Sequence, residues 1–283
     1  MKQSSVIGID MGGTQLRGGV VTGNEVSGIV SASVHSEGSV DQVLEQLFAL
    51  VQQLLDPSVK GIGIGVPGLV SMPKGVVYDV VNIASWKEVP LKQLMEDRFQ
   101  LPIKFENDAN CFALGEYWFG KGRGHDSMLG LTIGTGLGSG IILNKKLYAG
   151  RHGGAGEFGM IEYLDKYYEY YASGQFFQNV YERDGREVFR LAKAGDKKAL
   201  AMYEEMGSHL GNAIRTILYT LDIDLIVLGG SVRHAFPYFS ESMWQQIRTL
   251  AFQRAADDLR IEVSELENSG ILGAAALLLE DVQ

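Results

Sequence analysis

The chain has 283 residues, 46% of them hydrophobic and 21% charged, which indicates a globular protein of one large domain or two medium ones. The net charge of −9 at pH 7 argues against a general affinity for nucleic acid, which needs a basic face. The single cysteine, Cys111, excludes an intrachain disulfide and a thiolate-rich zinc site. The sequence contains no apolar run long enough to span a membrane and no signal-peptide pattern, so we expect a cytoplasmic protein.

The first elements are two strands joined by a glycine turn. The apolar run VIGID ends in Asp10, the turn follows at residues 12–14, and apolar residues return at positions 16–21. Residues 129–143 repeat this pattern at an offset of 122 positions, which aligns glycines 8, 12 and 18 with glycines 130, 134 and 140. The repeat favours an internal duplication, although glycine-rich hairpins in general could produce it.

Helical patterns separate and follow these hairpins. Ser39 and Gln42 form a capping box before an amphipathic segment, and Pro90 suits the first position of another helix. Further helices are predicted at 108–119, 197–220, 238–257 and 270–280, with a buried strand at 224–230.

Strands that alternate with helices predict an α/β fold. We expect a smaller N-terminal lobe over residues 1–115 and a larger lobe over 116–269, with the terminal helix 270–283 packing back on the first lobe. The two similar halves, with their glycine turns facing each other, would leave a cleft between the lobes, where ligand sites are favoured.

Two glycine turns are candidates for binding phosphate. The first contains Asp10, Gly12, Gly13 and Thr14, and the second contains Thr135 and Gly136. Glycines let backbone N–H groups approach a phosphate, threonine adds a hydroxyl donor, and a carboxylate such as Asp10 can hold Mg²⁺, usually through water. A single such turn could equally be a plain hairpin turn. The pair favours a polyphosphate held across a cleft, and neither turn matches a P-loop or Rossmann motif.

A third glycine pair, Gly229-Gly230, follows the strand LIVLGG. A strand that leads into glycines and then a helix could shelter an adenine ring. Taken alone, an ordinary turn between a strand and a helix is the better interpretation.

The stretch Glu106-Asn107-Asp108-Ala109-Asn110 lies between a strand and a helix. A carboxylate there can accept the proton of a sugar hydroxyl as that oxygen attacks phosphorus, or the polar residues can cap the helix. Glu157, in a glycine-dense loop, and Glu169, in YYEYYASG, could accept hydrogen bonds from sugar hydroxyls. On spacing alone each glutamate is more typical of a solvated surface.

The motifs DMGGT, GVPG, ENDAN, IGTGLGSG, GGAGEFG, ExxxSG and IVLGG occur in one order along essentially the whole chain. In this order and spacing the chain resembles the ROK family (repressor, open reading frame, kinase). The resemblance implies the two-lobed, actin-like ATPase (ribonuclease H-like) fold of the hexokinase superfamily, which agrees with the repeat. It also implies an ATP-dependent hexose kinase of the glucokinase type that uses Mg²⁺ and acts on a small-molecule sugar, and that commonly forms a homodimer.

By motif, Asp108 resembles the catalytic base, with the 6-hydroxyl of the sugar as its expected target. Asp10 resembles the Mg²⁺ contact. The remaining roles are carried over in the same way: Gly68, Asn82, Asn107, Glu157 and Glu169 resemble sugar contacts; Gly12, Gly13, Thr14, Thr135 and Gly136 resemble phosphate contacts; Gly229 and Gly230 resemble the adenosine wall.

One departure concerns a histidine and a zinc-binding cysteine motif that most family members carry. This chain has Met160 at the histidine position and no cysteine in the segment that follows. The departure implies no zinc site and a sugar pocket that differs near the C1 and C2 hydroxyls, with tyrosines 167, 168, 170 and 171 in place of the zinc module or as ordinary apolar filling. Alternatives to a glucokinase are an N-acylhexosamine kinase, another hexose or β-glucoside kinase, and a non-catalytic sugar-sensing regulator. The regulator is disfavoured because the phosphate strand starts at residue 6, which leaves no room for a helix-turn-helix.

Overall fold

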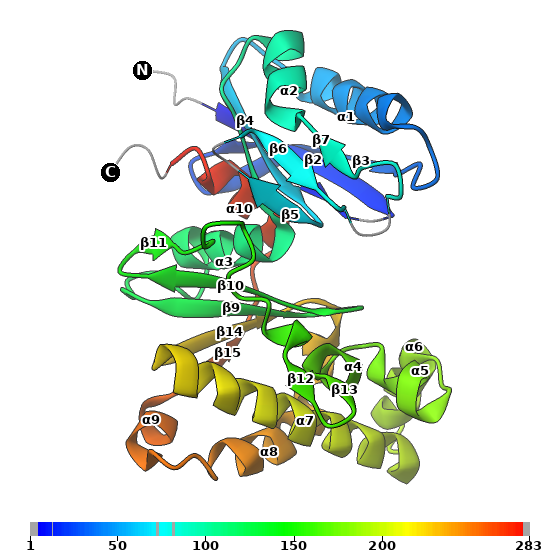
Figure 1. Ribbon diagram of the computed structural model, residues 1–283, viewed down its shortest axis with the longest axis vertical. Coiled ribbons are helices and arrows are strands. Elements are labelled where there is room, and N and C mark those ends of the chain that lie inside the picture. The colour runs from blue at the N-terminus through cyan, green and yellow to red at the C-terminus, as the bar shows by residue number, and fades with distance from the viewer. Residues whose placement is uncertain (1–4, 13, 72–73, 81–82, 280–283) are drawn as a thin grey trace. The chain divides into compact units, whose positions relative to one another are not determined.

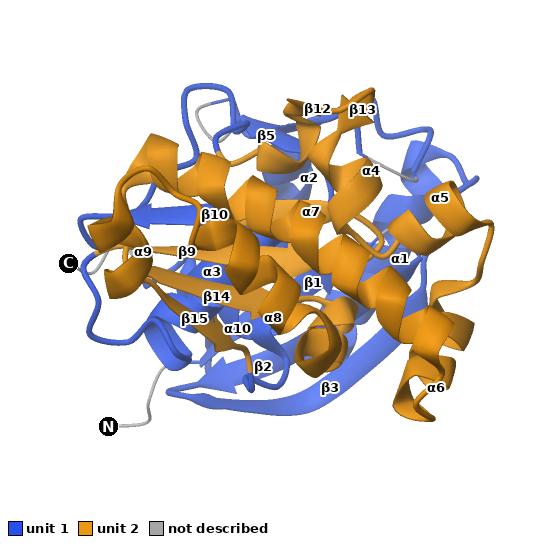
Figure 2. Cartoon of the chain, turned by 90° about the horizontal axis from the view of Figure 1, so that it is seen from below, with its two compact units in different colours: residues 1–126, 140–155, 265–283 blue, residues 127–139, 156–264 orange. Residues whose placement is uncertain are grey.

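The computed structural model describes residues 5–12, 14–71, 74–80 and 83–279. The candidate residues Gly13 and Asn82 lie outside the described residues. The chain forms two compact units, coloured separately in Figure 2. The first comprises residues 1–126, 140–155 and 265–283, and the second comprises 127–139 and 156–264.

This division differs from a single boundary after residue 115, because residues 116–126 and 140–155 group with the N-terminal unit. Close packing explains the second of these segments. A Cβ on Gly140 would lie 2.6 Å from the carbonyl oxygen of Ala109, and one on Gly153 would lie 2.4 Å from that of Val70. Both contacts tie residues 140–155 to neighbours within the first unit.

The first unit is built on a five-stranded sheet of order β3-β2-β1-β4-β8 (Figure 1). Strands β1, β4 and β8 are parallel to one another, and β2 and β3 add antiparallel at one edge. The strands are β1 (Ser5–Met11), β2 (Gln15–Thr22), β3 (Glu25–Ser33), β4 (Val59–Val66) and β8 (Ile103–Asn107). A small antiparallel sheet joins β5 (Leu69–Ser71), β6 (Val76–Tyr78) and β7 (Glu88–Val89).

Helices cover both faces of this sheet. Ile7 and Ile9 of β1 share a buried core with Leu47 and Leu50 of α1 (Val40–Leu54). Gly8 points to the opposite face, where a Cβ would lie 2.0 Å from the carbonyl oxygen of Ile271 in α10 (Ser269–Ala276). Because successive strand residues face opposite sides, glycine at position 8 lets the backbone of α10 lie directly on β1.

The remaining helices of this unit are α2 (Leu91–Phe99) and α3 (Asp108–Phe119). The Ser39–Gln42 capping box of α1 is confirmed, since each side chain bonds the other residue's backbone N–H. The expectation for Pro90 is wrong by one position, because it is the N-cap of α2 rather than its first helical residue.

A second five-stranded sheet has the order β11-β10-β9-β14-β15, and the boundary between the units falls within β10. Its strands are β9 (Met128–Ile133), β10 (Leu137–Leu143), β11 (Lys146–Leu147), β14 (Leu225–Gly229) and β15 (Arg260–Val263). Each corresponds to a strand at the same place in the first sheet, including the parallel β9-β14-β15 set and the antiparallel edge strand β11. This shared strand order supports the duplication inferred from the glycine repeat.

The second unit also contains the hairpin β12 (Glu162–Tyr163) and β13 (Lys166–Tyr167), and helices α4 (Tyr168–Ala172), α5 (Phe176–Tyr181), α6 (Gly185–Lys193), α7 (Lys197–Leu221), α8 (Phe236–Ile247) and α9 (Gln253–Asp258). Short 3₁₀ turns η1 (Phe158–Met160) and η2 (Ser231–Ala235) complete it. The single helix expected over 238–257 is wrong. The chain leaves α8 at Arg248, buries Leu250, and donates the Ala251 N–H to the Tyr219 hydroxyl before α9 begins.

Among the described residues, no helix is both long and apolar enough to span a lipid bilayer.

Candidate active site

Asp10 is the penultimate residue of the central strand β1 and is paired with Arg17 on β2. Burial raises the pKa of the Asp10 carboxyl, and the Arg17 guanidinium acts in the opposite direction. A Cβ on Gly270 would lie 2.6 Å from the Asp10 carboxylate, so the start of α10 closes against this side chain. Arg17 also donates to Asn268 Oδ1 at 2.8 Å, just before α10. Arg17, Asn268 and Gly270 thus form the surroundings of Asp10, and sequence reasoning had singled out none of them.

The first glycine turn is held by its own backbone. The Gly12 N–H donates to the Gln15 carbonyl at 2.8 Å, and the Thr14 carbonyl accepts from Val34 N–H at 3.0 Å. The Gly12 N–H is therefore occupied within the turn. A phosphate there would meet the exposed tip at Thr14 rather than the Gly12 amide.

The second glycine turn lies at the matching place between β9 and β10. The Gly134 N–H donates to the Gly136 carbonyl at 3.0 Å, and Thr135 is exposed at the tip. A Cβ on Gly134 would meet nothing within 4 Å, so the space beside that residue is open. Both turns thus have an internal backbone hydrogen bond and an exposed threonine, but the bond spans three residues in the first turn and two in the second, and the threonine is the third residue of the first turn and the second residue of the other.

The segment that carries Glu169 forms hydrogen bonds to this second turn and to Leu137, which follows it. Glu169 Oε2 accepts from Leu137 N–H at 2.9 Å, Ser173 Oγ donates to the Thr135 carbonyl at 3.0 Å, and Gly174 N–H donates to the Gly134 carbonyl at 2.7 Å. A Cβ on Gly136 would lie 2.4 Å from Glu169 Oε2. A side chain at position 136 would therefore have to displace the Glu169 carboxylate from the Leu137 N–H.

Gly229 and Gly230 follow β14 as expected. Gly230 has φ of 75°, and a Cβ there would lie 2.2 Å from the carbonyl oxygen of Ile133. The left-handed backbone and this close approach require glycine whether or not a nucleotide binds. Arg233 NH1 donates to the Gly230 carbonyl at 2.8 Å and holds the turn.

Asn107 and Asp108 lie where β8 becomes α3. Asn107 Oδ1 accepts from the N–H groups of Ala109 at 2.9 Å and Asn110 at 3.3 Å, so Asn107 is the N-cap of α3. Asn107 Nδ2 donates to the Gly68 carbonyl at 3.3 Å, which brings two candidate sugar contacts together. Asp108, the first residue of α3, is half-buried, and its Oδ1 accepts from Ala109 N–H at 2.8 Å.

Glu106 supports this turn from inside the protein. It is buried, and its Oε1 accepts from the backbone N–H of Asn107 at 2.8 Å and from Asn110 Nδ2 at 3.2 Å. These bonds fix the N-terminus of α3 and thereby the position of Asp108. A buried glutamate before an N-cap is not a pattern that the sequence alone distinguishes.

The sheet register brings Asp10 and Asp108 to one edge. Asp10 is aligned with Gly65 on β4, and Gly65 is aligned with Glu106 on β8. Strand β1, which carries Asp10, and strand β8, which directly precedes Asp108, are therefore two strand spacings apart, about 10 Å. Both aspartates follow or end strands at their carboxyl ends, which is where open α/β sheets bind ligands.

In the second unit the charge of Glu169 acts on Glu157. Partial burial raises the pKa of the Glu157 carboxyl, and the negative charge of Glu169 raises it further. Glu157 directly precedes the turn η1, which ends in Met160, a residue that is 56% exposed. The described residues contain no group of three or more His, Cys, Asp or Glu side chains placed to hold a metal ion.

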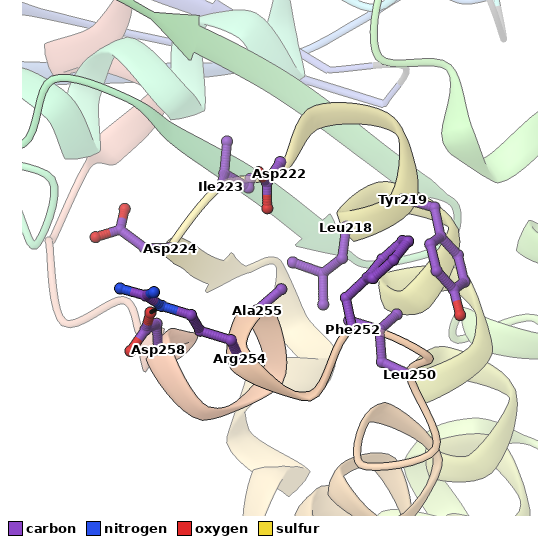
Figure 3. Close-up of a pocket in the computed structure, with 10 residues that line it drawn as sticks. All are labelled: Leu218, Tyr219, Asp222, Ile223, Asp224, Leu250, Phe252, Arg254, Ala255 and Asp258. Carbon is purple, nitrogen blue, oxygen red and sulfur yellow. Dashed lines mark ion pairs between the residues drawn. The ribbon is translucent and has the colours of Figure 1, made fainter.

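A pocket of about 610 Å³ lies elsewhere in the second unit, between the end of α7 and α9 (Figure 3). Leu218, Tyr219, Leu250 and Phe252 form its apolar part, and its arginine, Arg254, is paired with Asp258. None of the candidate site residues lines it.

Comparison with known proteins identifies the family. The profile of the ROK family matches residues 6–281, nearly the whole chain. The chain belongs to the ROK family. Its fold class is accordingly the α/β, actin-like ATPase fold of the ROK kinases.

Three relatives of this chain, two named as glucokinases and one as a repressor, illustrate the range of functions named among its relatives. A glucokinase of Halalkalibacterium halodurans is 32% identical over 250 residues, which cover 77% of this chain and 76% of the relative. A solved structure of a Streptomyces griseus ROK glucokinase with glucose and AMPPNP has a TM-score of 0.83 at 28% identity, covering 97% of this chain and 99% of that one. A xylose repressor of Caldicellulosiruptor bescii is 26% identical and covers 98% of this chain and 79% of the relative.

Proposed function

We propose that this chain, an ATP-dependent sugar kinase of the ROK family, transfers the γ-phosphoryl group of ATP to a hexose hydroxyl, with the 6-hydroxyl as the expected acceptor. The observation that carries the proposal is the shared sheet edge of the first unit. Asp10, near the end of β1, and Asp108, directly after β8, both lie at the carboxyl-terminal ends of these parallel strands, about two strand spacings apart. In this proposal Asp10, which lies just before the first glycine turn, serves the nucleotide, and Asp108 serves the sugar hydroxyl.

The nucleotide would be held by the two glycine turns. Their tips carry Thr14 and Thr135, and glycine at 134 leaves open space beside the second turn. Asp10 fits a contact to Mg²⁺ through water, because its carboxylate oxygens are the ligand type that Mg²⁺ prefers and the residue lies just before the first glycine turn. When bound, Mg²⁺ would supply positive charge that offsets the charge of the transferring phosphoryl group.

Asp108 would act as the general base. Its carboxylate is fixed at the N-terminus of α3 by the buried Glu106 and the Asn107 cap. A base in this role accepts the proton of the attacking hydroxyl as the bond to phosphorus forms. Asn107 has its Oδ1 engaged in capping and one Nδ2 bond to Gly68, so the remaining Nδ2 hydrogen is the group it would offer a sugar.

Glu157, Glu169 and Gly68 are the further proposed sugar contacts, together with Asn82. Met160 is exposed beside Glu157, which leaves an apolar side chain where a polar neighbour of the sugar would otherwise lie. An N-acylhexosamine or another hexose or β-glucoside is therefore a serious alternative to glucose. We also propose a cytoplasmic homodimer with no nucleic-acid partner.

A substrate panel tests the proposal. The purified chain is incubated with Mg·ATP and, separately, glucose, mannose, fructose, allose, N-acetylglucosamine, N-acetylmannosamine or cellobiose, and ADP release is recorded. We expect at least one sugar to raise ADP release well above the sugar-free rate, and chelation of Mg²⁺ to abolish the effect. A chain that no sugar stimulates would contradict the proposal.

A sugar-sensing regulator is the second candidate, because a xylose repressor is among the relatives. Calorimetry on the same sugar panel separates the two. Sugar binding without any ADP release would favour the regulator, whereas binding accompanied by turnover favours the kinase.

A further inference from the structure

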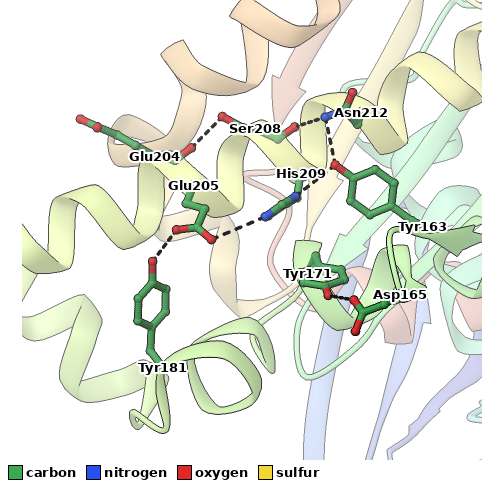
Figure 4. Close-up of polar contacts among 9 residues, drawn as sticks. All are labelled: Tyr163, Asp165, Tyr171, Tyr181, Glu204, Glu205, Ser208, His209 and Asn212. Atoms are coloured by element: carbon green, nitrogen blue, oxygen red, sulfur yellow. Dashed lines mark hydrogen bonds and ion pairs between the residues drawn. The ribbon is translucent and has the colours of Figure 1, made fainter.

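The hairpin β12-β13 and helix α4 are held on α7 by a polar and aromatic network (Figure 4). The Tyr163 hydroxyl bonds His209 Nδ1 at 3.1 Å and accepts from Asn212 Nδ2 at 3.2 Å. The Tyr163 ring stacks on Tyr168, with centroids 4.4 Å apart and an angle of 21° between the rings. The Tyr168 hydroxyl in turn bonds Thr216 Oγ1 on α7 at 2.8 Å. Two tyrosines therefore dock this segment on one face of α7.

The direction of the hydrogen bonds follows from these partners. The Glu205 carboxylate on the Nε2 side of the imidazole favours the tautomer with its proton on Nε2, and Nδ1 then accepts from the Tyr163 O–H. Nε2 lies 3.8 Å from Glu205 Oε1. Burial lowers the pKa of His209, with Glu205 acting in the opposite direction, and burial raises the pKa of Tyr163. A neutral imidazole and a protonated phenol are the forms that this bond requires.

The docked segment ends on the second glycine turn. Helix α4 carries Glu169, which accepts the Leu137 N–H, and the next two residues after α4, Ser173 and Gly174, bond the carbonyls of Thr135 and Gly134. Tyr171, also on α4, packs on the His209 ring at 5.0 Å. A displacement of α4 from α7 would thus move a proposed sugar contact and a proposed phosphate turn together.

We propose that His209, with Tyr163 and Asn212, is a positioning residue that sets Glu169 and the turn 134–136 as one unit and so couples the sugar to the nucleotide. The inference rests on the proposed function for the roles of Glu169 and the turn. The physical link itself, from α7 through α4 to the Leu137 amide, does not depend on any activity.

Hydrogen exchange tests the link without activity. Tyr163→Phe keeps the ring that stacks on Tyr168 and removes only the hydroxyl. We expect faster amide exchange at 134–137 and 173–174 in this variant. The matched control is Tyr219→Phe, which removes another bonded hydroxyl of the same unit, the acceptor of Ala251 N–H, and should leave those amides unchanged. Unchanged exchange in Tyr163→Phe would overturn the proposal.

Two substitutions of His209 separate hydrogen bonding from volume. His209→Asn keeps an acceptor near the Nδ1 position, whereas His209→Leu fills the space without one. We expect the asparagine variant to retain most of the protection at 134–137 and the leucine variant to lose it. Equal protection in both would mean that packing alone holds α4, and would contradict the proposal.

Kinetics then test the coupling. We expect Tyr163→Phe to raise the KM values for sugar and for Mg·ATP together, by about 3- to 30-fold, the range of couplings carried through packed networks. In a Glu169→Gln background the same substitution should change the sugar KM by much less, because the contact it positions is already altered. If Tyr163→Phe raised the sugar KM equally in the wild type and in the Glu169→Gln variant, the substitution would not act through Glu169, and the proposal would be contradicted. If the exchange result holds and no sugar is phosphorylated by the wild type, the proposed function fails and the structural link stands.

Discussion

Some side chains at the candidate site both stabilise the local fold and are proposed to bind the substrate. Asn107 caps α3 through Oδ1 and reaches Gly68 through Nδ2, and Glu169 both tightens a glycine turn and lies beside Glu157. Capping and catalysis were competing interpretations of the ENDAN stretch on sequence alone. The structure assigns the cap to Asn107, which leaves the adjacent Asp108 as the carboxylate proposed for the chemistry.

The raised pKa of Glu157 makes a prediction about stability and pH. Burial and the charge of Glu169 raise this pKa in the folded state, so the folded protein binds more protons than the unfolded chain above the ordinary glutamate pKa. The contribution of Glu157 to stability is therefore present near pH 4 and is lost as pH rises through the raised pKa. We predict that Glu157→Gln unfolds at higher denaturant concentration than the wild type at pH 7, while its sugar KM rises.

Urea titrations at pH 4.5 and pH 7 check this prediction, with Glu162→Gln as the control because Glu162 is exposed on the neighbouring hairpin. A Glu157→Gln variant less stable than the wild type at pH 7 would show that Glu157 is a stabilising residue rather than one held for binding.

Gly270 makes a second prediction at this scale. A Cβ there would lie 2.6 Å from the Asp10 carboxylate, a side chain that can move aside. We therefore expect Gly270→Ala to shift the unfolding midpoint little and to raise the KM for Mg·ATP. Combining it with Asp10→Asn should add almost nothing, because both changes act on one carboxylate. If the two increases in the KM for Mg·ATP were additive in the double variant, Gly270 would not act through Asp10.

At the scale of elements, the sequence was most informative where local chemistry decides the structure. The Ser39 capping box, the start of α3 at Asp108 and the paired glycine hairpins follow from spacing and propensity, and the structure has all three. The break between α8 and α9 was missed because Leu250 is buried by tertiary packing, while its residue type fits a continuing helix. The hydrogen bond from the Leu137 N–H to Glu169 was also not predicted, because 32 residues separate the two groups.

The close backbone contacts of α10 with β1, β4 and α3 could not be predicted from periodicity either. It depends on glycines spread over the chain, at positions 8 and 63 in the strands and 115 and 273 in the helices. Each is an ordinary glycine by its neighbours in sequence. Only the tertiary contact shows that a side chain at any of them would meet backbone of another element.

Gly63 allows this packing to be tested. A Cβ there would lie 1.8 Å from the carbonyl oxygen of Ala274, a backbone atom that cannot rotate away. We expect Gly63→Ala to lower the free energy of unfolding by about 3 kcal/mol, at the upper end of overpacking effects. Gly154→Ala is the control, since its Cβ would meet only Leu69 Cδ2 at 3.8 Å. Equal stability of the two variants in urea would contradict direct contact of α10 with β4.

Across the whole chain, the two five-stranded sheets share one strand order and one pattern of strand directions. The duplication explains why one kind of glycine turn occurs twice, between β1 and β2 and between β9 and β10. The halves have since diverged, because Asp10 precedes the first turn whereas Thr132, bonded to the Gly138 carbonyl, takes the matching position before the second. This difference supports a single proposed Mg²⁺ contact in the first half.

The role of Asp108 tests the account most directly. Asp108→Asn removes the proposed base with little change in shape. Single-turnover phosphoryl transfer is measured with the best sugar of the panel at saturating Mg·ATP, and sugar affinity is measured by calorimetry. Asp97→Asn, an exposed aspartate on α2, is the control. We predict transfer slowed by about 10²- to 10⁴-fold, the usual contribution of a general base, with nearly unchanged sugar affinity. Transfer in Asp108→Asn as fast as in the control would contradict the account.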